Sequence, residues 1–307
     1  MSELRWHPLL EQWVTIAPWR QERTYHPTAA DCPLCPTKPG GIQTEVPESD
    51  YHIAVFENRF PAYTGDQGRC EVVLYTPEHD SSLGAQPLDH IRDLVEVWQD
   101  RLRDLSRLTG VRYVFIFENR GEQIGVTLSH PHGQIYAYPF IPPLVERELA
   151  ASARHERQTG RCLYCDVLAG ESGGERLVAG DENWLAFVPP FARWPYEVHL
   201  APRRHRGDLL ELTEPEAVSM AAVLKTLLQK YDNLFAMPLP YVMAMHQRPP
   251  GRGRRHYHLH VEFYPPNRTA AKLKYLAGSE LGAGAFIVDA AAEETAARLR
   301  EVEPRSG

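Results

Sequence analysis

The sequence repeats itself at a fixed spacing, and this repeat constrains the fold more than any other feature. Three pairs of like residues lie 126 positions apart: His79 and His205, His130 and His256, and Pro139 and Pro265. Two C-x-x-C pairs lie 130 positions apart, which a single four-residue gap reconciles with the same repeat. Self-similarity at one spacing indicates a duplicated structural unit. We therefore expect an α+β chain of two tandem copies, residues 1–150 and 151–307, packed as one body around a continuous sheet.

Both halves have the same predicted order of strands and helices. Apolar residues at three-to-four spacing predict a helix over residues 87–108 and another over 213–231, the second opened by a capping box from Thr213 to Glu216. Two strands are expected before each helix and two after it. Besides a short strand at 13–16, the expected strands are 52–56, 71–75, 111–117 and 135–141 in the first half, and 184–188, 196–200, 241–245 and 256–265 in the second.

The segment Ser129–Tyr136, S-H-P-H-G-Q-I-Y, has polar side chains at alternate positions. Residues two apart share a face of an extended chain, so His130, His132 and Gln134 are expected to point the same way. A neutral imidazole is a metal ligand and a nucleophile, whereas a carboxamide forms hydrogen bonds without acting as an acid. The pattern favours a histidine that attacks and a glutamine that orients. The alternative is a histidine pair on a half-buried strand.

Four of the five cysteines form the two C-x-x-C pairs, and Cys70 stands alone. The N-terminal residues lack an apolar signal core, so metal binding or redox chemistry is favoured over disulfides. The first pair lies among prolines and glycines, which is typical of a metal site, and two histidines follow each pair. Cys2His2 is a ligand set typical of structural Zn²⁺. We predict two zinc ions per chain, one held by Cys32, Cys35, His79 and His130, the other by Cys162, Cys165, His205 and His256. The alternative is reduced cysteines without metal.

Composition narrows the partners and the location. The formal charge is −7, from 33 basic and 40 acidic residues, which argues against nucleic acid as a general partner. Nowhere do eighteen consecutive apolar residues occur, so no membrane partner is expected. We expect a cytoplasmic protein.

Several motifs together resemble one enzyme family. H-P-H-G-Q-I at 130–135 combines with C-P-L-C at 32–35, P-E-H at 77–79, F-E-N-R-G at 117–121 and H-L-H-V-E-F-Y-P-P at 258–266. These motifs are similar to those of the galactose-1-phosphate uridylyltransferase family of the histidine-triad superfamily, and the resemblance spans nearly the whole chain. It implies two tandem histidine-triad-like repeats that form one continuous antiparallel-sheet body with flanking helices.

The resemblance also implies a transferase of galactose metabolism that works by double displacement. His132 would attack the α-phosphorus of UDP-glucose and release glucose 1-phosphate, and galactose 1-phosphate would then take the uridylyl group. A backbone carbonyl should hold Nδ1–H of His132. Gln134 would hold the phosphoryl oxygens without supplying a proton, which protects the uridylyl-histidine intermediate from hydrolysis.

Further residues take roles by the same resemblance. Nucleotide and phosphate contacts are implied for Asn58, Asn119, Gly125 and Thr127, and sugar-phosphate contacts for Lys274 and Glu280. Arg20 and Arg23 match arginines that approach the partner subunit's site, which implies a homodimer; the alternative for both is simple surface charge.

The chain also departs from the family pattern. Ser279 and Phe286 stand where some relatives use Tyr and Gln near the hexose, so sugar specificity is open. Some relatives hold a further metal at positions that correspond to Glu148, His246, His260 and 262, but position 262 here is Glu. The 248–255 loop is either a phosphate-binding loop or a solvated one. Two other functions stay open, namely an ADP-glucose phosphorylase and a non-catalytic nucleotide-binding module.

Overall fold

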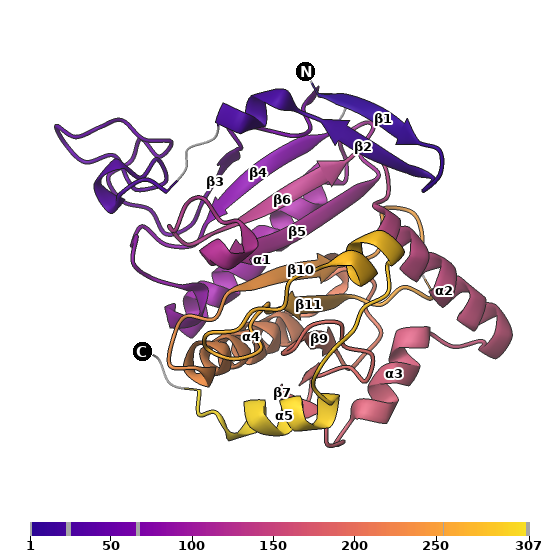
Figure 1. Ribbon diagram of the computed structural model, residues 1–307. Helices are drawn as coiled ribbons and strands as arrows, with labels where there is room; N and C mark the ends of the chain where they lie inside the picture. The colour runs from indigo at the N-terminus through magenta and orange to yellow at the C-terminus, as the bar shows by residue number, and fades with distance from the viewer. Residues whose placement is uncertain (1, 23–25, 66–67, 254, 305–307) are drawn as a thin grey trace.

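A computed structural model describes residues 2–22, 26–65, 68–253 and 255–304, and one large sheet organises them (Figure 1). Its strands lie in the order β3-β4-β6-β5-β10-β11-β9-β8-β7, and every neighbouring pair is antiparallel. The strands are β3 (Ala54–Glu57), β4 (Arg69–Leu74), β5 (Tyr113–Arg120), β6 (His132–Tyr138), β7 (Leu177–Gly180), β8 (Trp184–Phe187), β9 (Val198–Pro202), β10 (Tyr241–His246) and β11 (His260–Tyr264). The predicted continuous antiparallel sheet is confirmed.

The strand order is mirrored about the centre of the sheet. From the centre outward, the order is β5-β6-β4-β3 on one side and β10-β11-β9-β8 on the other, with β7 beyond β8. The two sets join where β5 pairs with β10, with Phe117 opposite Ala244. The tandem repeat predicted from residue spacing is therefore present as two four-stranded units in one sheet.

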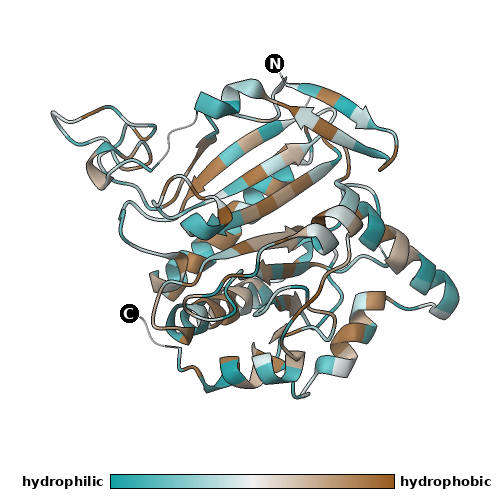
Figure 2. Cartoon of the chain, viewed as in Figure 1, coloured by the Kyte–Doolittle hydropathy of each residue, from teal (hydrophilic) through white to brown (hydrophobic). Residues whose placement is uncertain are grey.

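Helices α1 (Leu88–Leu105) and α4 (Glu214–Leu234) pack side by side against one face of the sheet (Figure 1). Leucine, isoleucine, valine and tryptophan side chains recur on α1 at helical spacing and are buried. The predicted capping box at Thr213 and Glu216 is formed and begins α4. Hydrophobic residues alternate with polar ones along several strands, as Figure 2 shows, because one face of the sheet meets the helices. Helix α5 (Ala292–Glu301) adds buried residues to the same core.

Among the described residues, five helices and strands were not predicted from sequence, and β7 and α5 are two of them. Helices α2 (Pro143–Thr159) and α3 (Leu163–Glu171) follow β6, and strand β1 (Glu3–His7) pairs with β2 (Gln12–Ile16) in a separate hairpin. The division into residues 1–150 and 151–307 stays a prediction, and α2 spans its boundary. Within the described residues, no helix is both long and apolar enough to cross a bilayer.

The sheet face opposite α1 and α4 presents the polar residues of the predicted motif. In β6, Ile135 and Ala137 are buried in the helix-side core, so His132, Gln134 and Tyr136 lie on the other face. Strand register carries one row across the sheet on this face, from Gln134 through Phe117, Ala244 and Glu262 to His199. The row joins the motif of the first half to polar residues of the second.

Candidate functional site

The imidazole of His132 is oriented by the backbone. Its Nδ1 lies 2.8 Å from the carbonyl oxygen of His130, so Nδ1 carries the proton and donates it to that oxygen. The other ring nitrogen, Nε2, keeps its lone pair. Burial lowers the pKa of His132 below its ordinary value, although the His130 carbonyl acts in the opposite direction. His132 is thus a neutral imidazole at neutral pH with a nucleophilic Nε2, and the predicted carbonyl contact is confirmed.

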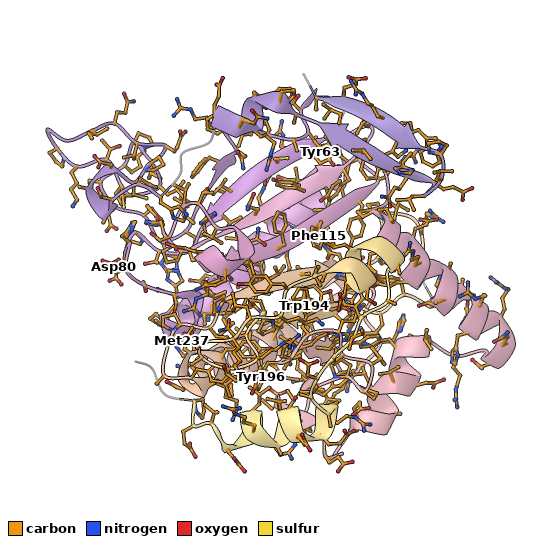
Figure 3. All side chains as sticks on the ribbon, in the orientation of Figure 1. Tyr63, Asp80, Phe115, Trp194, Tyr196 and Met237 are labelled. Carbon is orange, nitrogen blue, oxygen red and sulfur yellow. The ribbon has the colours of Figure 1, made fainter. Side chains whose placement is uncertain are left out.

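A cleft of about 1150 Å³ opens where β5 ends and β6 begins. His132 lines it from the start of β6 and Asn119 from the end of β5. Asp80 and Met237, labelled in Figure 3, line the same cleft. Gln134 lies one row further along the sheet, beside Val72 and Phe117. The predicted nucleophile and one predicted nucleotide contact therefore share a cleft of ligand size.

Two other predicted contacts, Arg20 and Asn58, are not among the described residues that line this cleft. Arg20 donates to the Phe60 carbonyl at 2.9 Å and to the Tyr136 hydroxyl at 3.3 Å, which places it over the face that bears Gln134. Asn58 also meets Phe60, because its Oδ1 accepts from the Phe60 amide at 2.8 Å.

The segment from 121 to 129 contributes to the cleft wall and contains two further predicted contacts. Gly125 ends a short 3-10 turn with φ at 84°, a conformation that favours glycine. The carbonyl of Thr127 accepts from the His26 amide at 3.0 Å. Arg23 lies outside the described residues.

Lys274 and Glu280, the predicted sugar-phosphate contacts, form an ion pair with each other at 3.3 Å. Lys274 is buried and also donates to the Ile287 carbonyl. Neither residue is among those that line the cleft of His132 in the described structure.

Cys32, Cys35, His79 and His130 come together as predicted. One donor atom from each lies within 4.8 Å of the others. The Cys35 sulfur is 3.3 Å from Nδ1 of His79 and 3.5 Å from Nδ1 of His130. Sulfur and nitrogen ligands of a tetrahedral zinc lie about 3.5 Å apart at the usual bond lengths. The donor set and its spacing therefore fit Zn²⁺.

Neighbouring groups orient both histidines of this cluster. Nε2 of His130 meets the Thr76 carbonyl at 2.8 Å and the Tyr51 hydroxyl at 3.0 Å. Nε2 of His79 lies 3.1 Å from the Ser129 hydroxyl. Metal-bound imidazoles commonly use their second nitrogen in this way, which leaves Nδ1 of each ring directed at the metal position.

The second cluster corrects one predicted ligand. Cys162, Cys165 and His205 come together, but the fourth donor is His258 and not His256. The Cys165 sulfur lies 3.3 Å from Nδ1 of His258 and 3.6 Å from Nδ1 of His205. His256 lies in the loop before β11 and instead pairs with Glu156 at 3.3 Å.

Strand register explains the correction. Strands β6 and β11 occupy equivalent places in the mirrored sheet, and the same Nδ1-to-carbonyl contact joins His260 to His258 at 2.8 Å and His132 to His130 at 2.8 Å. His258 therefore corresponds to His130, an offset of 128 residues and not the 126 that the spacing of His79 and His205 indicates.

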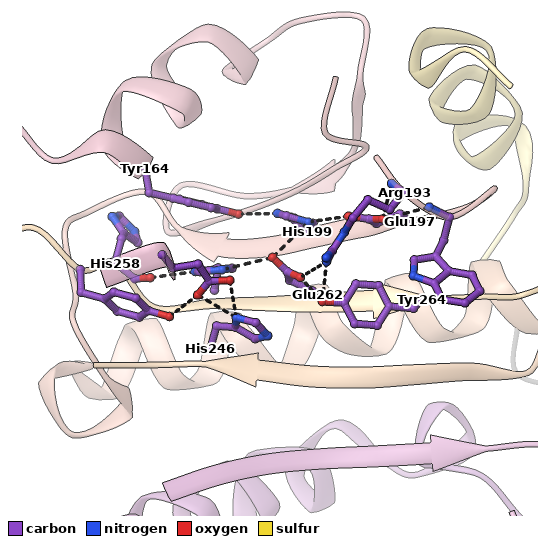
Figure 4. Close-up of polar contacts among 12 residues, drawn as sticks. Tyr164, Arg193, Glu197, His199, His246, His258, Glu262 and Tyr264 are labelled. Carbon is purple, nitrogen blue, oxygen red and sulfur yellow. Dashed lines mark hydrogen bonds and ion pairs between the residues drawn. The ribbon is translucent and has the colours of Figure 1, made fainter. Parts of the chain in front are cut away.

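A third cluster lies under the second half of the same sheet face (Figure 4). Glu148 of α2 lies 2.9 Å from Nδ1 of His246, and Glu262 lies 3.3 Å from Nε2 of His260 and 3.4 Å from Nε2 of His199. Donor atoms of Glu148, His246, His260 and Glu262 all lie within 4.8 Å of one another. Only Glu148, His246 and His260 could be suggested from sequence, through the family resemblance. Glu262 and His199 join them because β11 pairs with β9.

Charge complementarity stabilises the third cluster. Burial alone would lower the pKa of His246, but the carboxylates of Glu148 and Glu262 raise it to about 9. Burial likewise opposes ionisation of Glu262, yet the neighbouring histidines hold the pKa of Glu262 well below its usual range. Arg193 adds a further contact to Glu262 at 3.2 Å. The cluster is a buried network of opposite charges.

Comparison with known proteins agrees with this geometry. Residues 62–142 match the model of the galactose-1-phosphate uridyl transferase N-terminal domain, and residues 148–305 match that of the C-terminal domain. The galactose-1-phosphate uridylyltransferase of Thermotoga maritima is 43% identical over 322 residues, covering 99% of each chain. That of Streptomyces lividans is 43% identical and covers 98% of this chain and 87% of the relative.

Solved structures give the same result. A uridylyltransferase structure matches with a TM-score of 0.89 at 36% identity over 98% of both chains. An ADP-glucose phosphorylase from Arabidopsis thaliana shares the fold, with a TM-score of 0.78 at 24% identity over 99% of both chains. The sheet, the cleft and the comparisons together establish that this chain belongs to the galactose-1-phosphate uridylyltransferase family.

Proposed function

We propose that this chain is a transferase of galactose metabolism that moves a uridylyl group between UDP-glucose and galactose 1-phosphate. Relatives with the name galactose-1-phosphate uridylyltransferase cover almost the whole chain. The observation that supports the reaction best is the state of His132, whose Nδ1 proton is fixed on the His130 carbonyl while the ring borders a ligand-sized cleft. A neutral histidine in this arrangement is prepared to attack phosphorus through Nε2.

The reaction proceeds in two displacements. The Nε2 lone pair of His132 bonds to the α-phosphorus of UDP-glucose, the bond from that phosphorus to the bridging oxygen breaks, and glucose 1-phosphate leaves with the electron pair. A phosphate oxygen of galactose 1-phosphate then bonds to the same phosphorus, the P–N bond breaks, and His132 is regenerated. Both steps conserve charge and need no redox partner. The Nδ1 contact to His130 stabilises the positive charge that develops on the ring.

Gln134 contributes hydrogen bonds but no acid. It shares the sheet face of His132, and its carboxamide can hold a phosphoryl oxygen without protonating the P–N bond. Asn119 lines the cleft and adds an amide there. Asn58, Gly125 and Thr127 supply nucleotide or phosphate contacts. Lys274 and Glu280 serve the sugar phosphate. These assignments follow the family pattern at matching positions.

The two Cys2His2 clusters each hold a structural Zn²⁺. The sulfur-to-nitrogen distances of 3.3 to 3.6 Å between Cys35 or Cys165 and their histidines support tetrahedral coordination. Zinc would fix the 32–46 loop and the start of α3 against the sheet. Because His130 is a zinc ligand and its carbonyl oxygen also accepts the Nδ1–H of His132, the first zinc supports the orientation of the nucleophile.

The chain acts as a homodimer in the cytoplasm. Trp6 and Trp13 of the β1–β2 hairpin are 49% and 42% exposed, an unusual exposure for tryptophan that a second subunit would relieve. Arg20 lies nearby in sequence and reaches Tyr136 on the reactive face. None of the five cysteines, all of them among the described residues, forms a disulfide, which agrees with a reducing compartment.

The proposed reaction is tested by trapping its intermediate. The protein is incubated with UDP-glucose or with ADP-glucose, without acceptor, and intact mass then reports a nucleotidyl adduct. Galactose 1-phosphate or inorganic phosphate is added to discharge it. We expect a uridylyl adduct that galactose 1-phosphate removes. An adenylyl adduct that only phosphate removes would identify an ADP-glucose phosphorylase, and no adduct with either sugar nucleotide would refute the mechanism.

A further inference from the structure

The glycine between His132 and Gln134 is required by space and not by its backbone angles. A Cβ added at Gly133 would lie 2.2 Å from the hydroxyl oxygen of Tyr75 and 3.0 Å from the ring carbon that bears it. Gly133 is absent from the residues with positive φ, so an alanine could adopt its backbone conformation. The Tyr75 side chain therefore touches the catalytic strand from behind, at the point midway between the two predicted catalytic residues.

Tyr75 is itself held in place from two sides. Its amide donates to the carbonyl of Pro131 at 3.2 Å, the residue immediately before His132. Its carbonyl accepts from Nε2 of His90 on α1 at 2.5 Å. The ring is fully buried in the helix-side core, so it cannot turn away without opening that core. The hydroxyl is thus a fixed contact under β6 at Gly133.

A buried carboxyl accompanies this hydroxyl. Glu118 on β5 is 4% exposed, lines the cleft, and accepts from the Tyr241 hydroxyl at 3.2 Å through Oε1. Tyr75 and Glu118 influence each other's pKa, and burial raises the pKa of Glu118 to about 7. The Tyr75 hydroxyl and Oε2 of Glu118 both lack a normal hydrogen bond within the described residues. Phenylalanine would fill the same space without burying this polar atom, so packing alone does not account for the hydroxyl.

We propose that Tyr75 is a positioning residue for the proposed reaction: its hydroxyl, packed against the backbone of Gly133 beside Glu118, sets the depth of strand β6 and thereby the position of Nε2 of His132. Transfer to phosphorus depends on the alignment of the attacking atom, and small displacements slow it strongly. Glycine at 133 and tyrosine at 75 are consequently a matched pair. This inference rests on His132 being the nucleophile.

The contact between Tyr75 and Gly133 is tested with one substitution that makes it too close and a second that relieves it. Gly133→Ala pushes the strand away from Tyr75, and we expect the single-turnover rate of adduct formation at saturating UDP-glucose to fall about 100-fold, as for other small misplacements. Tyr75→Phe in the same chain removes the atom nearest the new methyl group, and the double variant should recover most of that loss. UDP affinity, measured by calorimetry, should stay within a few-fold in every variant, because a strand shift misaligns attack more than it alters nucleotide binding.

Two matched controls separate positioning from general packing. Tyr231→Phe removes another fully buried hydroxyl, which donates to the Tyr196 carbonyl at 2.8 Å, and Gly170→Ala adds a methyl group where nothing lies within 4 Å. Both should retain the wild-type rate.

Glu118→Gln and Tyr75→Phe alone should each slow adduct formation several-fold, and together by less than the product of their effects.

Three results would overturn the inference. The first is a double variant that reacts no faster than Gly133→Ala and unfolds at the same temperature as that single variant. The second is a Gly133→Ala variant that reacts at the wild-type rate. The third is an unaltered rate in both Tyr75→Phe and Glu118→Gln. If Gly133→Ala does not fold, the last comparison decides alone. A wild-type protein that forms no adduct would refute the proposed function, and rescue of thermal stability in the double variant would still report the contact.

Discussion

The two halves of the sheet present the same motif with opposite consequences. His132 and His260 begin equivalent strands, and each donates Nδ1–H to the carbonyl two residues earlier at 2.8 Å. His132 lines an open cleft, whereas His260 is only 5% exposed and lies under the Tyr164 ring at 4.4 Å. A backbone carbonyl that accepts Nδ1–H is therefore not sufficient to make a histidine reactive toward substrate. Under the proposed function, access to substrate decides which of the two histidines can react.

The residue two positions after each of these histidines, Gln134 or Glu262, adds to the difference between the halves. Gln134 is neutral, while Glu262 is buried, ionised and paired with His199 and His260. Helix α2 brings Glu148 over the second half, and α3 brings Tyr164. A carboxylate among histidines stabilises a closed network, but it would repel the phosphoryl oxygens of a nucleotide. Under the proposed function, the first half receives an anionic substrate, whereas the carboxylates of the second half pair with its own histidines.

The largest expected effect separates the two histidines. His132→Ala should lower the rate of uridylyl transfer at least about 10⁴-fold, because nothing replaces a covalent nucleophile. His260→Ala should retain the rate within about tenfold, since a change outside the reacting centre acts only through packing, and should mainly lower thermal stability. Steady-state assays with thermal unfolding of both variants make the comparison. Equal losses of activity would contradict the division between the halves.

Replacing Gln134 by the glutamate that occupies the equivalent position 262 should make the first half less reactive, as the second half is. Gln134→Glu places a carboxylate beside the transferred phosphoryl group and should slow adduct formation about 100-fold, comparable to loss of a transition-state donor. The single-turnover rate of adduct formation measures this. Glu262→Gln is the matched change in the second half and should leave that rate nearly unaltered.

The same Glu262→Gln variant should be less stable. It removes one charge from a buried network, which costs about 3 kcal/mol of unfolding free energy when the partners stay charged. Denaturant unfolding at pH 7 measures the loss. A variant as stable as wild type would show that the network does not depend on this carboxylate.

The corrected zinc ligand gives an effect of intermediate size. His258→Ala should lose one zinc per chain and about 3 kcal/mol or more of stability, whereas His256→Ala breaks only a partly exposed pair with Glu156 and should cost less than about 1 kcal/mol. Metal analysis of both purified variants decides between them. Zinc lost from His256→Ala and kept by His258→Ala would reverse the correction.

The smallest effect concerns pH. Burial lowers the pKa of His132, so the neutral reactive ring persists below the ordinary value of about 6.5 for histidine. Protonation removes the Nε2 lone pair, and the adduct-forming rate should therefore be level above that pH and fall only as pH drops through the lowered pKa. A single-turnover rate profile tests the sign. A rate that already declines between pH 8 and pH 7 would be inconsistent with a neutral His132.

Much of this fold could be predicted because the duplication is visible in residue spacing and the core helices are strongly periodic. Helix α1 and the capping box of α4 formed where predicted. Helices α2 and α3 were missed, since α2 is largely polar and the sequence of α3 begins within a C-x-x-C pair. These two helices form part of what distinguishes the second half, so sequence alone did not show why its histidines are enclosed.

The candidate site was predicted in the same uneven way. His130 and His132 could be identified because local strand alternation determines their face and the family motif determines their roles. His256 was selected by equal spacing, but the number of residues between equivalent strands differs from that between His79 and His205, and two positions decide which histidine reaches the cysteines. Tyr75 gave no sequence signal, because its contact with Gly133 is made by a side chain that reaches from the end of β4 to the neighbouring strand β6.

The most direct test of the difference between the halves is a map of the modified residue. Wild-type protein is treated with UDP-glucose alone, the released glucose 1-phosphate is removed, and peptides are analysed under conditions that preserve a phosphorus–nitrogen bond. We predict one uridylyl group per chain, attached to His132. A uridylyl group on His260, or on no histidine, would contradict the account.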